Sequence, residues 1–279
     1  LAYHPDRLTY PVRRVGPKAS GRWERISWDE ALDTIAARIN DTKERFGAES
    51  IVLGYGTGRD NEAVIYRFAN LLGTPNVLTA GHFCYGPRIA TSILTCGTNP
   101  IVDYENNPRC LMVWGNNIVI SNPDEYKGEP FSAALSKGAK LIAVDPWMTR
   151  IAARADLWLR LRPGTDAALA LGLLNVIVNE ELYDKEFVEN HVYGWEPFVK
   201  RVQEYPLDKV EQITWVAKEK IMEAARLFAT TKPAGIQWGV AIEQQINGAD
   251  NDRLLLALMG ITGNIDVPGG QVLFQQPRV

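Results

Sequence analysis

Several features that would assign a sequence to a class at once are missing from these 279 residues. No apolar run approaches the roughly 20 residues that a membrane-spanning helix needs, so direct membrane insertion is not expected. The 30 Lys and Arg against 33 Asp and Glu give a net charge of -3, which supplies neither a basic face for nucleic acid nor a polybasic anchor. The three cysteines form no Cys-x-x-Cys pair, so neither a disulfide framework nor an internal zinc or iron–sulfur site is indicated.

The amino terminus, Leu1-Ala2-Tyr3-His4-Pro5, has neither an initiator Met nor the charged and apolar regions of a signal peptide. We therefore expect the chain to be part of a longer protein whose export signal would lie elsewhere, and the sequence assigns no compartment. A Gly-x-Gly-x-x-Gly turn after the first strand of a βαβ unit is also missing, which disfavours a nicotinamide-dependent dehydrogenase.

The sequence does contain enough apolar residues, 46%, for a sizeable core. Ser27-Trp28-Asp29-Glu30 is a capping-box pattern that predicts a helix ending near Phe46-Gly47. Short apolar runs predict strands at residues 50–54, 76–79, 110–114, 140–144, 157–161 and 235–238. Periodic segments predict helices at residues 61–72, 166–179, 217–230 and 252–259, and part of another at 131–137. This alternation predicts an α/β fold with doubly wound, mainly parallel sheets and helices on both faces.

The polar stretch from Asp103 to Pro108 has no apolar periodicity, and we expect it to separate two closely packed α/β lobes. The first lobe would comprise residues 1–105 and the second, Rossmann-like lobe residues 106–279. The strand at residues 76–79 leads into the loop Gly81-His82-Phe83-Cys84-Tyr85-Gly86-Pro87-Arg88. Open α/β sheets place ligands beyond the carboxyl ends of their strands, so this loop is a candidate for chemistry.

Within this loop, Cys84 has two interpretations. A free cysteine is often a small buried apolar residue. Gly81, Gly86 and Pro87 make the loop tight, however, and Gly86 with Pro87 can begin a helix at Ile89, whose amino terminus would favour a thiolate. A thiolate is a soft ligand that suits a high-valent metal held by sulfur.

Three polar residues flank this cysteine. His82, Tyr85 and Arg88 would supply a proton carrier, a phenolic hydrogen bond and a fixed cation for an anionic substrate. Simpler roles are equally open, because a loop histidine is commonly a surface residue and Arg88 can simply pair with a carboxylate.

Turns at the ends of strands suit a dinucleotide. Gly115, Asn116 and Asn117 follow one strand and offer close backbone approach with amide donors for phosphates. Asp145 and Pro146 end the next strand, where a carboxylate suits ribose hydroxyls or the N–H edge of a guanine, although an Asp-Pro pair alone is only a turn.

Two further turns have an ordinary explanation beside a functional one. Arg162-Pro163-Gly164-Thr165-Asp166 enters a helix whose N-cap would be Thr165, a place that suits an anion or a guanine edge but is also explained by capping alone. Gly54-Tyr55-Gly56-Thr57-Gly58 only superficially suits a phosphate, because its spacing does not match a phosphate loop and tight geometry accounts for its glycines.

In this order and at these separations, the motifs resemble the central region of the molybdopterin oxidoreductases of the dimethyl sulfoxide reductase family. The pieces that carry the resemblance are the Cys84 loop, Val144-Asp145-Pro146, the Arg162–Asp166 turn, Thr262-Gly263-Asn264 and Pro268-Gly269-Gly270. These enzymes hold molybdenum or tungsten between two molybdopterin guanine dinucleotides. They usually begin with a domain for a 4Fe-4S cluster and end with a β-rich cofactor-binding domain, neither of which is found in this chain.

The resemblance implies roles for particular residues. Cys84 would be the metal ligand, and the dinucleotide would be held by residues of four turns: Gly115, Asn116, Asn117, Asp145, Pro146, Gly164, Thr165, Asp166, Gly239 and Gln244. The last two come from a segment, Gln237 to Gly248, that aligns only with an insertion. The chain departs from the pattern at Ala80, where several relatives have asparagine, and at Trp147, where relatives usually have arginine.

The resemblance also implies an activity. The intact protein would catalyse two-electron redox chemistry or oxygen-atom transfer on a small substrate, as in anaerobic respiration, and would pass electrons to an iron–sulfur partner subunit. The alternative is a non-catalytic scaffold of the same fold without a pterin, which the presence of Cys84 and Asp145 disfavours. Because the missing domains would supply walls of the cofactor site, we expect the isolated chain to hold no metal or cofactor and to be inactive.

Overall fold

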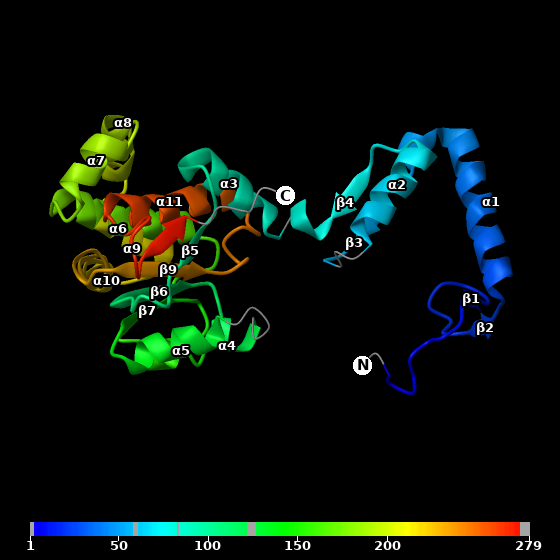
Figure 1. Ribbon diagram of the computed structural model, residues 1–279, viewed down its shortest axis with the longest axis horizontal. Coiled ribbons are helices and arrows are strands. Elements are labelled where there is room, and N and C mark those ends of the chain that lie inside the picture. Colours follow the sequence, from blue (N-terminus) through cyan, green and yellow to red (C-terminus); the bar gives the residue numbers. More distant parts are fainter. Residues whose placement is uncertain (1–2, 58–60, 83, 122–126, 274–279) are drawn as a thin grey trace. The chain divides into compact units, whose positions relative to one another are not determined.

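The computed structural model describes residues 3–57, 61–82, 84–121 and 127–273. Contacts divide the chain into two compact units, residues 1–80 and residues 81–279. Figure 1 shows both units, with colours that follow the sequence from blue at the amino terminus to red at the carboxyl terminus.

The first unit begins with an antiparallel pair, β1 (Val12–Arg14) and β2 (Trp23–Arg25), followed by the long helix α1 (Trp28–Phe46). The predicted cap is confirmed, because Ser27 Oγ accepts a hydrogen bond from the Glu30 amide at 3.0 Å. The Glu30 carboxylate accepts from Arg13 Nη1 at 2.6 Å. Within this unit no residue of α1 is buried.

The rest of the first unit is a short β-α-β unit. The strands β3 (Leu53–Tyr55) and β4 (Val77–Thr79) pair in parallel and are joined through α2 (Glu62–Leu72). The expectation of a buried strand at residues 50–54 is wrong, because the three residues of β3 are half-buried or exposed. Gly58, which ends the predicted glycine turn, lies outside the described residues.

The second unit is built on a four-stranded, wholly parallel sheet in the order β8-β7-β6-β9. Its strands are β6 (Cys110–Trp114), β7 (Lys140–Val144), β8 (Leu157–Leu159) and β9 (Ala234–Trp238). The register places Trp114 opposite Val144 on one side and Trp238 on the other. The carboxyl ends of three strands therefore meet at one edge of the sheet.

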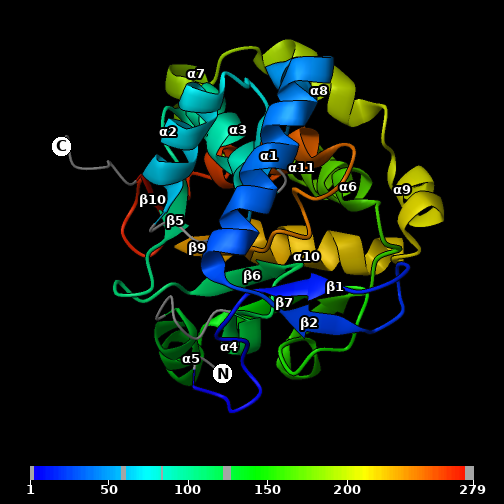
Figure 2. The same ribbon diagram turned by 90° about the vertical axis from the view of Figure 1, so that its right-hand side faces the viewer.

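Helices cover both faces of this sheet, as Figures 1 and 2 show. Leu111 and Val113 face α5 (Gly128–Ser136), and the short α4 (Ile118–Ser121) lies beside α5. Met112 and Trp114 belong to the larger core on the other face, which includes residues of α6 (Asp166–Asn179), α10 (Lys218–Thr230) and α11 (Gly248–Ile261). The predicted doubly wound α/β fold is confirmed.

The remaining elements complete the second unit. Helix α3 (Gly86–Cys96) packs on α11, and β5 (Pro100–Val102) pairs antiparallel with β10 (Gln271–Leu273). The helices α7 (Lys185–His191), α8 (Trp195–Gln203) and α9 (Leu207–Thr214) were not expected from the sequence. None of the helices in the described part of the chain has the length and apolar character needed to traverse a bilayer.

The lobe boundary expected after residue 105 lies inside the second unit. Asp103 binds the turn before β10, since its amide donates to the Gly270 carbonyl at 2.9 Å and its carboxylate accepts from the Gly269 amide at 3.0 Å. The polar stretch that suggested a linker is therefore tied to the carboxyl-terminal turn. How the intact protein divides into lobes stays a prediction.

Candidate functional site

The order of the parallel strands identifies a place for a ligand in the second unit. The chain runs outward from β6 through β7 to β8 and then returns to add β9 on the other side of β6. Such a reversal opens a crevice outside the carboxyl ends of β6 and β9, the two strands between which the direction changes. The turns after β6 and β9, at Gly115 and Gly239, lie at this point.

These two turns are packed backbone against backbone. Gly115 has a φ of +54°, and a Cβ at Gly239 would collide with the carbonyl oxygen of Gly115. The Gly239 amide donates to the Trp114 carbonyl at 3.1 Å, and the Gly115 amide donates to the Val144 carbonyl at 2.9 Å. The two glycines therefore allow a close approach that a side chain at position 239 would prevent.

The asparagines after Gly115 differ in their bonding. Asn116 Nδ2 donates to the carbonyl of Trp238 at 3.1 Å, which ties the first turn to the end of β9. The Oδ1 atom of Asn117 is buried and accepts no hydrogen bond from any described residue. Buried polar atoms are normally paired, so this oxygen is suited to a donor from a ligand.

Asp145 lies at the same edge of the sheet, directly after β7. Its Oδ1 accepts from the Trp147 amide at 2.8 Å, and Pro146 and Trp147 are exposed. Burial raises the pKa of Asp145, the Trp147 amide opposes that rise, and the negative charge of Asp166 adds to it. The two carboxylates predicted to hold a nucleotide are thus close enough to affect each other.

Asp166 begins α6 and is only 7% exposed. Its Oδ1 accepts from Trp114 Nε1 and its Oδ2 from Gln245 Nε2, both at 2.8 Å. It therefore connects the end of β6, the start of α6 and the segment after β9. Each oxygen keeps a second lone pair for a further donor.

The neighbouring turn is not explained by capping alone. Thr165 occupies the N-cap position of α6, but its side chain makes no capping bond and its hydroxyl donates to the Arg162 carbonyl at 2.6 Å. Gly164 has a φ of +81° and is exposed, so the turn favours glycine there.

Gln245 is a residue of the site that sequence reasoning missed. Gln244, which was proposed, is exposed, whereas Gln245 binds Asp166 and accepts from Asn251 Nδ2 at 3.4 Å. The adjacent glutamines were visible in the sequence, but this segment has no periodicity that would decide which of them points inward.

The loop before α3 carries Cys84, whose thiol is free and half-exposed. A Cβ at Gly86 would collide with the Gly81 carbonyl, which confirms a tight loop, and α3 begins at Gly86, earlier than predicted. His82 is exposed. Tyr85 is 37% exposed, and its hydroxyl accepts from Asn99 Nδ2 at 2.8 Å. Phe83 lies outside the described residues.

Arg88 has the simpler of its two predicted roles, because it pairs with a carboxylate. It is 7% exposed, and its Nε donates to Glu243. Its Nη2 donates to the Trp238 carbonyl at 3.0 Å, and its guanidinium lies over the rings of Tyr85 and Trp238. The sequence did not reveal Glu243 as its partner.

One carbonyl therefore connects the two candidate binding elements. The oxygen of Trp238 accepts from Arg88, four residues after Cys84, and from Asn116 of the turn after β6. Among the described residues, no group of three His, Cys, Asp or Glu side chains is placed to hold a metal ion. A metal at Cys84 would thus need its other ligands from outside the described residues.

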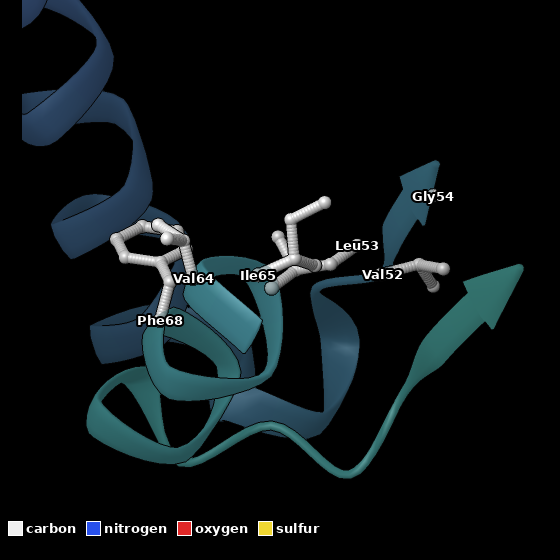
Figure 3. Close-up of a pocket in the computed structure, with 6 residues that line it drawn as sticks. All are labelled: Val52, Leu53, Gly54, Val64, Ile65 and Phe68. Carbon is white, nitrogen blue, oxygen red and sulfur yellow. The ribbon is translucent and has the colours of Figure 1, made fainter. Parts of the chain in front are cut away.

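The first unit offers a different surface. An apolar hollow of about 430 Å³ is lined by residues of α2 and of the segment around β3, namely Val52, Leu53, Gly54, Val64, Ile65 and Phe68 (Figure 3). None of these side chains can donate, accept or exchange a proton. The hollow is therefore no candidate for catalysis.

Comparison with known proteins finds similar sequences over almost the whole chain. Residues 7–274 match the model of the family described as molybdopterin oxidoreductase. Acetylene hydratase from Syntrophotalea acetylenica is 43% identical over 275 residues, and formate dehydrogenase H from Escherichia coli is 34% identical over 269 residues. The aligned regions cover 97% and 94% of this chain, but only 37% of each relative.

A solved structure shows the same similarity. The acetylene hydratase from Pelobacter acetylenicus superposes with a TM-score of 0.80 at 42% sequence identity, covering 97% of this chain and 37% of that protein. The chain thus corresponds to little more than a third of the length of these relatives.

Proposed function

The chain belongs to the molybdopterin oxidoreductase family, and from this premise we propose that it supplies the central part of a larger catalytic subunit that binds a bis(molybdopterin guanine dinucleotide) metal centre. The intact protein would act on a small molecule. Its 4Fe-4S cluster would lie in another domain, and an iron–sulfur subunit would be its electron-transfer partner. One relative is named as a subunit, the thiosulfate reductase molybdopterin-containing subunit of Salmonella typhimurium, which supports the presence of a partner subunit.

The observation that carries this proposal is the shared carbonyl of Trp238. It receives hydrogen bonds from Arg88 and Asn116, so the helix after Cys84 and the turn after β6 are fixed to the same strand end. A metal ligand and a dinucleotide site on one rigid sheet edge are what a metal–dinucleotide cofactor requires.

The residues present fit a dinucleotide. The unpaired Oδ1 of Asn117 suits a donor group of a ligand, and the close approach of Gly115 and Gly239 fixes the turn that carries it against the end of β9. Among the described residues, only the Trp147 amide donates to the Asp145 carboxylate, which leaves acceptor capacity for the paired N–H groups of a guanine. Gln245 and Trp114 hold Asp166 in place beside it.

Each group then has a distinct task. When bound, the molybdenum or tungsten centre supplies the two-electron step, and the protein supplies binding, orientation and electrostatics. Cys84 provides a protein ligand. His82 and Tyr85, which both reach solvent, are the side chains of this loop that can hold or transfer a proton near a substrate.

Metal and pterin analysis of the intact protein, purified without oxygen, tests the proposal. We expect about two pterins per molybdenum or tungsten, as the family implies. Cys84→Ala should lower the metal content sharply, whereas Cys96→Ala should not, because the Cys96 thiol donates to the Ser92 carbonyl within α3. If metal content and turnover both survive Cys84→Ala, Cys84 is not a ligand. Absence of both metal and pterin after growth with both metals would favour the non-catalytic scaffold.

The dinucleotide site has its own test. Asp145→Asn removes an acceptor of the paired guanine donors and should lower retention of the guanine dinucleotide about tenfold or more, since a charge-assisted hydrogen bond contributes about 1.5–3 kcal/mol. The released nucleotide can be measured by chromatography. Asp250→Asn, at an exposed position of α11, is the matched control. Equal retention in both variants would contradict the role of Asp145.

A second activity, addition of water to an alkyne, is favoured by one observation. The chain is 43% identical to an acetylene hydratase and 30% identical to a dimethyl sulfoxide reductase from Haemophilus influenzae. Assays of the intact protein for acetylene hydration and for viologen-coupled reduction of sulfoxides would separate the two activities. Activity in only one assay identifies the reaction class.

The chain of 279 residues alone should behave differently. We propose that it binds no metal at stoichiometric level, because the family site is enclosed by further domains. Elemental analysis of this chain, expressed with both metals supplied, checks this statement, and stoichiometric molybdenum would overturn it.

A further inference from the structure

Three charged side chains are buried where α3 packs on α11. Arg88 of α3 is 7% exposed, Glu243 of the segment between β9 and α11 is 4% exposed, and Asp252 of α11 is fully buried at 0%. Trp238, at the end of β9, joins them. Its indole Nε1 donates to Asp252 Oδ1 at 2.9 Å, and its carbonyl accepts from Arg88.

In each of the two carboxyl groups of this cluster, only one of the two oxygens accepts a hydrogen bond. One oxygen of Glu243 accepts from Arg88 Nε, and one oxygen of Asp252 accepts from Trp238 Nε1. The other oxygens, Glu243 Oε2 and Asp252 Oδ2, are buried without a hydrogen bond to any described residue. An ionised carboxylate can only accept, whereas a protonated one can also donate. A retained proton would therefore improve the bonding of a pair that is otherwise short of donors.

The charge balance leads to the same conclusion. If both carboxyl groups were ionised, one guanidinium would face two negative charges, and the buried cluster would keep a net charge of -1. A buried unpaired charge is expensive, and such groups usually neutralise by changing protonation. One bound proton makes the cluster neutral.

The electrostatics of Asp252 involve few groups. Burial raises its pKa to about 7, the negative charge of Glu243 adds to the rise, and Arg88 and the Trp238 indole oppose it. Burial also raises the pKa of Glu243, against the effect of Arg88. The helices α6 and α7 and the strand β9 also pack on α11, but among the described residues only Glu243 and Arg88 contribute a charge that acts on Asp252.

We propose that Glu243 and Asp252 bind one proton between them, and that this proton keeps Arg88 and the first turn of α3 fixed to the end of β9. Arg88 lies four residues after Cys84, so Glu243 and Asp252 act as positioning residues for the Cys84 loop. Loss of the proton adds an uncompensated buried charge and weakens this packing. The protonated pair does not require the cofactor and is present in the apoprotein as well.

The indole of Trp238 reports directly on the state of Asp252. In the 279-residue chain, labelled with ¹⁵N, the 8 tryptophans give at most one indole N–H signal each, and Trp238→Phe identifies the signal of interest. We expect this signal in the wild-type chain to move in a single transition centred near pH 7. Asp252→Asn should abolish the transition. Glu243→Gln should move its midpoint to lower pH, because it removes a negative neighbour.

Controls separate this proposal from a purely structural role. Asp250→Asn exchanges a carboxyl for an amide at an exposed position of α11 and should leave the midpoint unchanged. The wild-type titration requires no variant that might fail to fold. A wild-type signal that stays fixed between about pH 5 and 9, a range chosen to bracket this transition, would overturn the proposal, and so would an unchanged midpoint in Glu243→Gln.

Discussion

The helices of the two compact units are stabilised in different ways. In the first unit, α1 has no buried residue, and Trp28, Leu32 and Ile35 are each more than half exposed. In the second unit, 11 of the residues of α6 are buried, and this helix packs on α9, α10 and α11. Helix α1 has a clear local signal, the Ser27 cap, whereas α6 is held by packing. Asp166, one of the proposed cofactor-binding residues, begins this packed helix.

The strongest test of this contrast is a pair of phenylalanine truncations. Phe228 of α10 is fully buried, and Phe46 of α1 is 60% exposed. Phe228→Ala should lower the free energy of unfolding of the second unit by about 3–5 kcal/mol, because it removes apolar contacts and leaves a cavity. Phe46→Ala should change that of the first unit by less than about 0.5 kcal/mol. Urea titration with hydrogen exchange read in peptides of each unit measures both, and similar losses would remove the contrast.

The buried carboxyl of Asp252 makes the stability of the second unit depend on pH. Its pKa rises from 3.8 in the unfolded chain to about 7 in the folded one, so the folded chain holds a proton that the unfolded chain has released. The contribution of this proton to the free energy of unfolding is fully present below pH 4 and is lost as the pH rises to about 7. The whole loss is roughly 2–4 kcal/mol. Asp252→Asn should remove this loss.

Urea titrations of wild type and Asp252→Asn between about pH 5 and 8 measure the difference in slope, and this window spans the change in protonation. The exposed Asp250→Asn variant is the control. Parallel pH profiles for wild type and Asp252→Asn would contradict the raised pKa. The other titrating groups are common to the Asp252→Asn and Asp250→Asn variants, so their contributions to the pH dependence of stability cancel when these two variants are compared.

Two glycine-to-alanine substitutions should change the stability of their units in opposite directions. Gly239→Ala puts a Cβ against the Gly115 carbonyl and should destabilise the second unit by about 1–3 kcal/mol, as overpacking does. Gly54→Ala, in β3, meets no atom within 4 Å and should stabilise the first unit by up to about 1 kcal/mol, because it restricts the unfolded chain. Thermal unfolding of each variant gives the sign. A stabilising Gly239→Ala would show that the two turns do not need their close approach.

The smallest effect concerns helix caps. Ser27→Ala removes the acceptor for the Glu30 amide and should weaken α1 by about 1 kcal/mol. Thr165→Ala should change the protection of α6 against hydrogen exchange by less than about 0.5 kcal/mol, because the Thr165 hydroxyl does not cap the helix. Hydrogen exchange at the first turns of both helices measures this difference. A larger effect at Thr165 would show that its bond to the Arg162 carbonyl supports the helix start.

The elements with clear local signals were predicted well. The α1 cap, β6 and β7 were found at their residues, since capping and uninterrupted apolar runs are encoded locally. The order of the strands in the sheet was not predicted, but the alternation of strands and helices was enough for the fold class. The helices α7 to α9 were missed because their segments are short and polar, and their positions are set by packing against α6 and α11.

The candidate site was predicted through its turns and missed in its supporting contacts. Gly115, Asp145 and Asp166 follow strands or begin a helix, so their positions could be inferred from the chain order. The hydrogen bond between Arg88 and Glu243 joins residues far apart in sequence, and no local pattern predicts it. The same holds for Gln245, which reaches Asp166 only after the sheet has formed.

The return of β9 to the far side of β6 also sets an order in time. Ribosomes release the chain from its amino terminus, so β6, β7 and β8 emerge before the strand that pairs Ala234 with Cys110. Until then one edge of β6 stays open to other chains, which is a hazard for aggregation in the cell. The turn at Gly115 can therefore meet Gly239 only after β9 has been made.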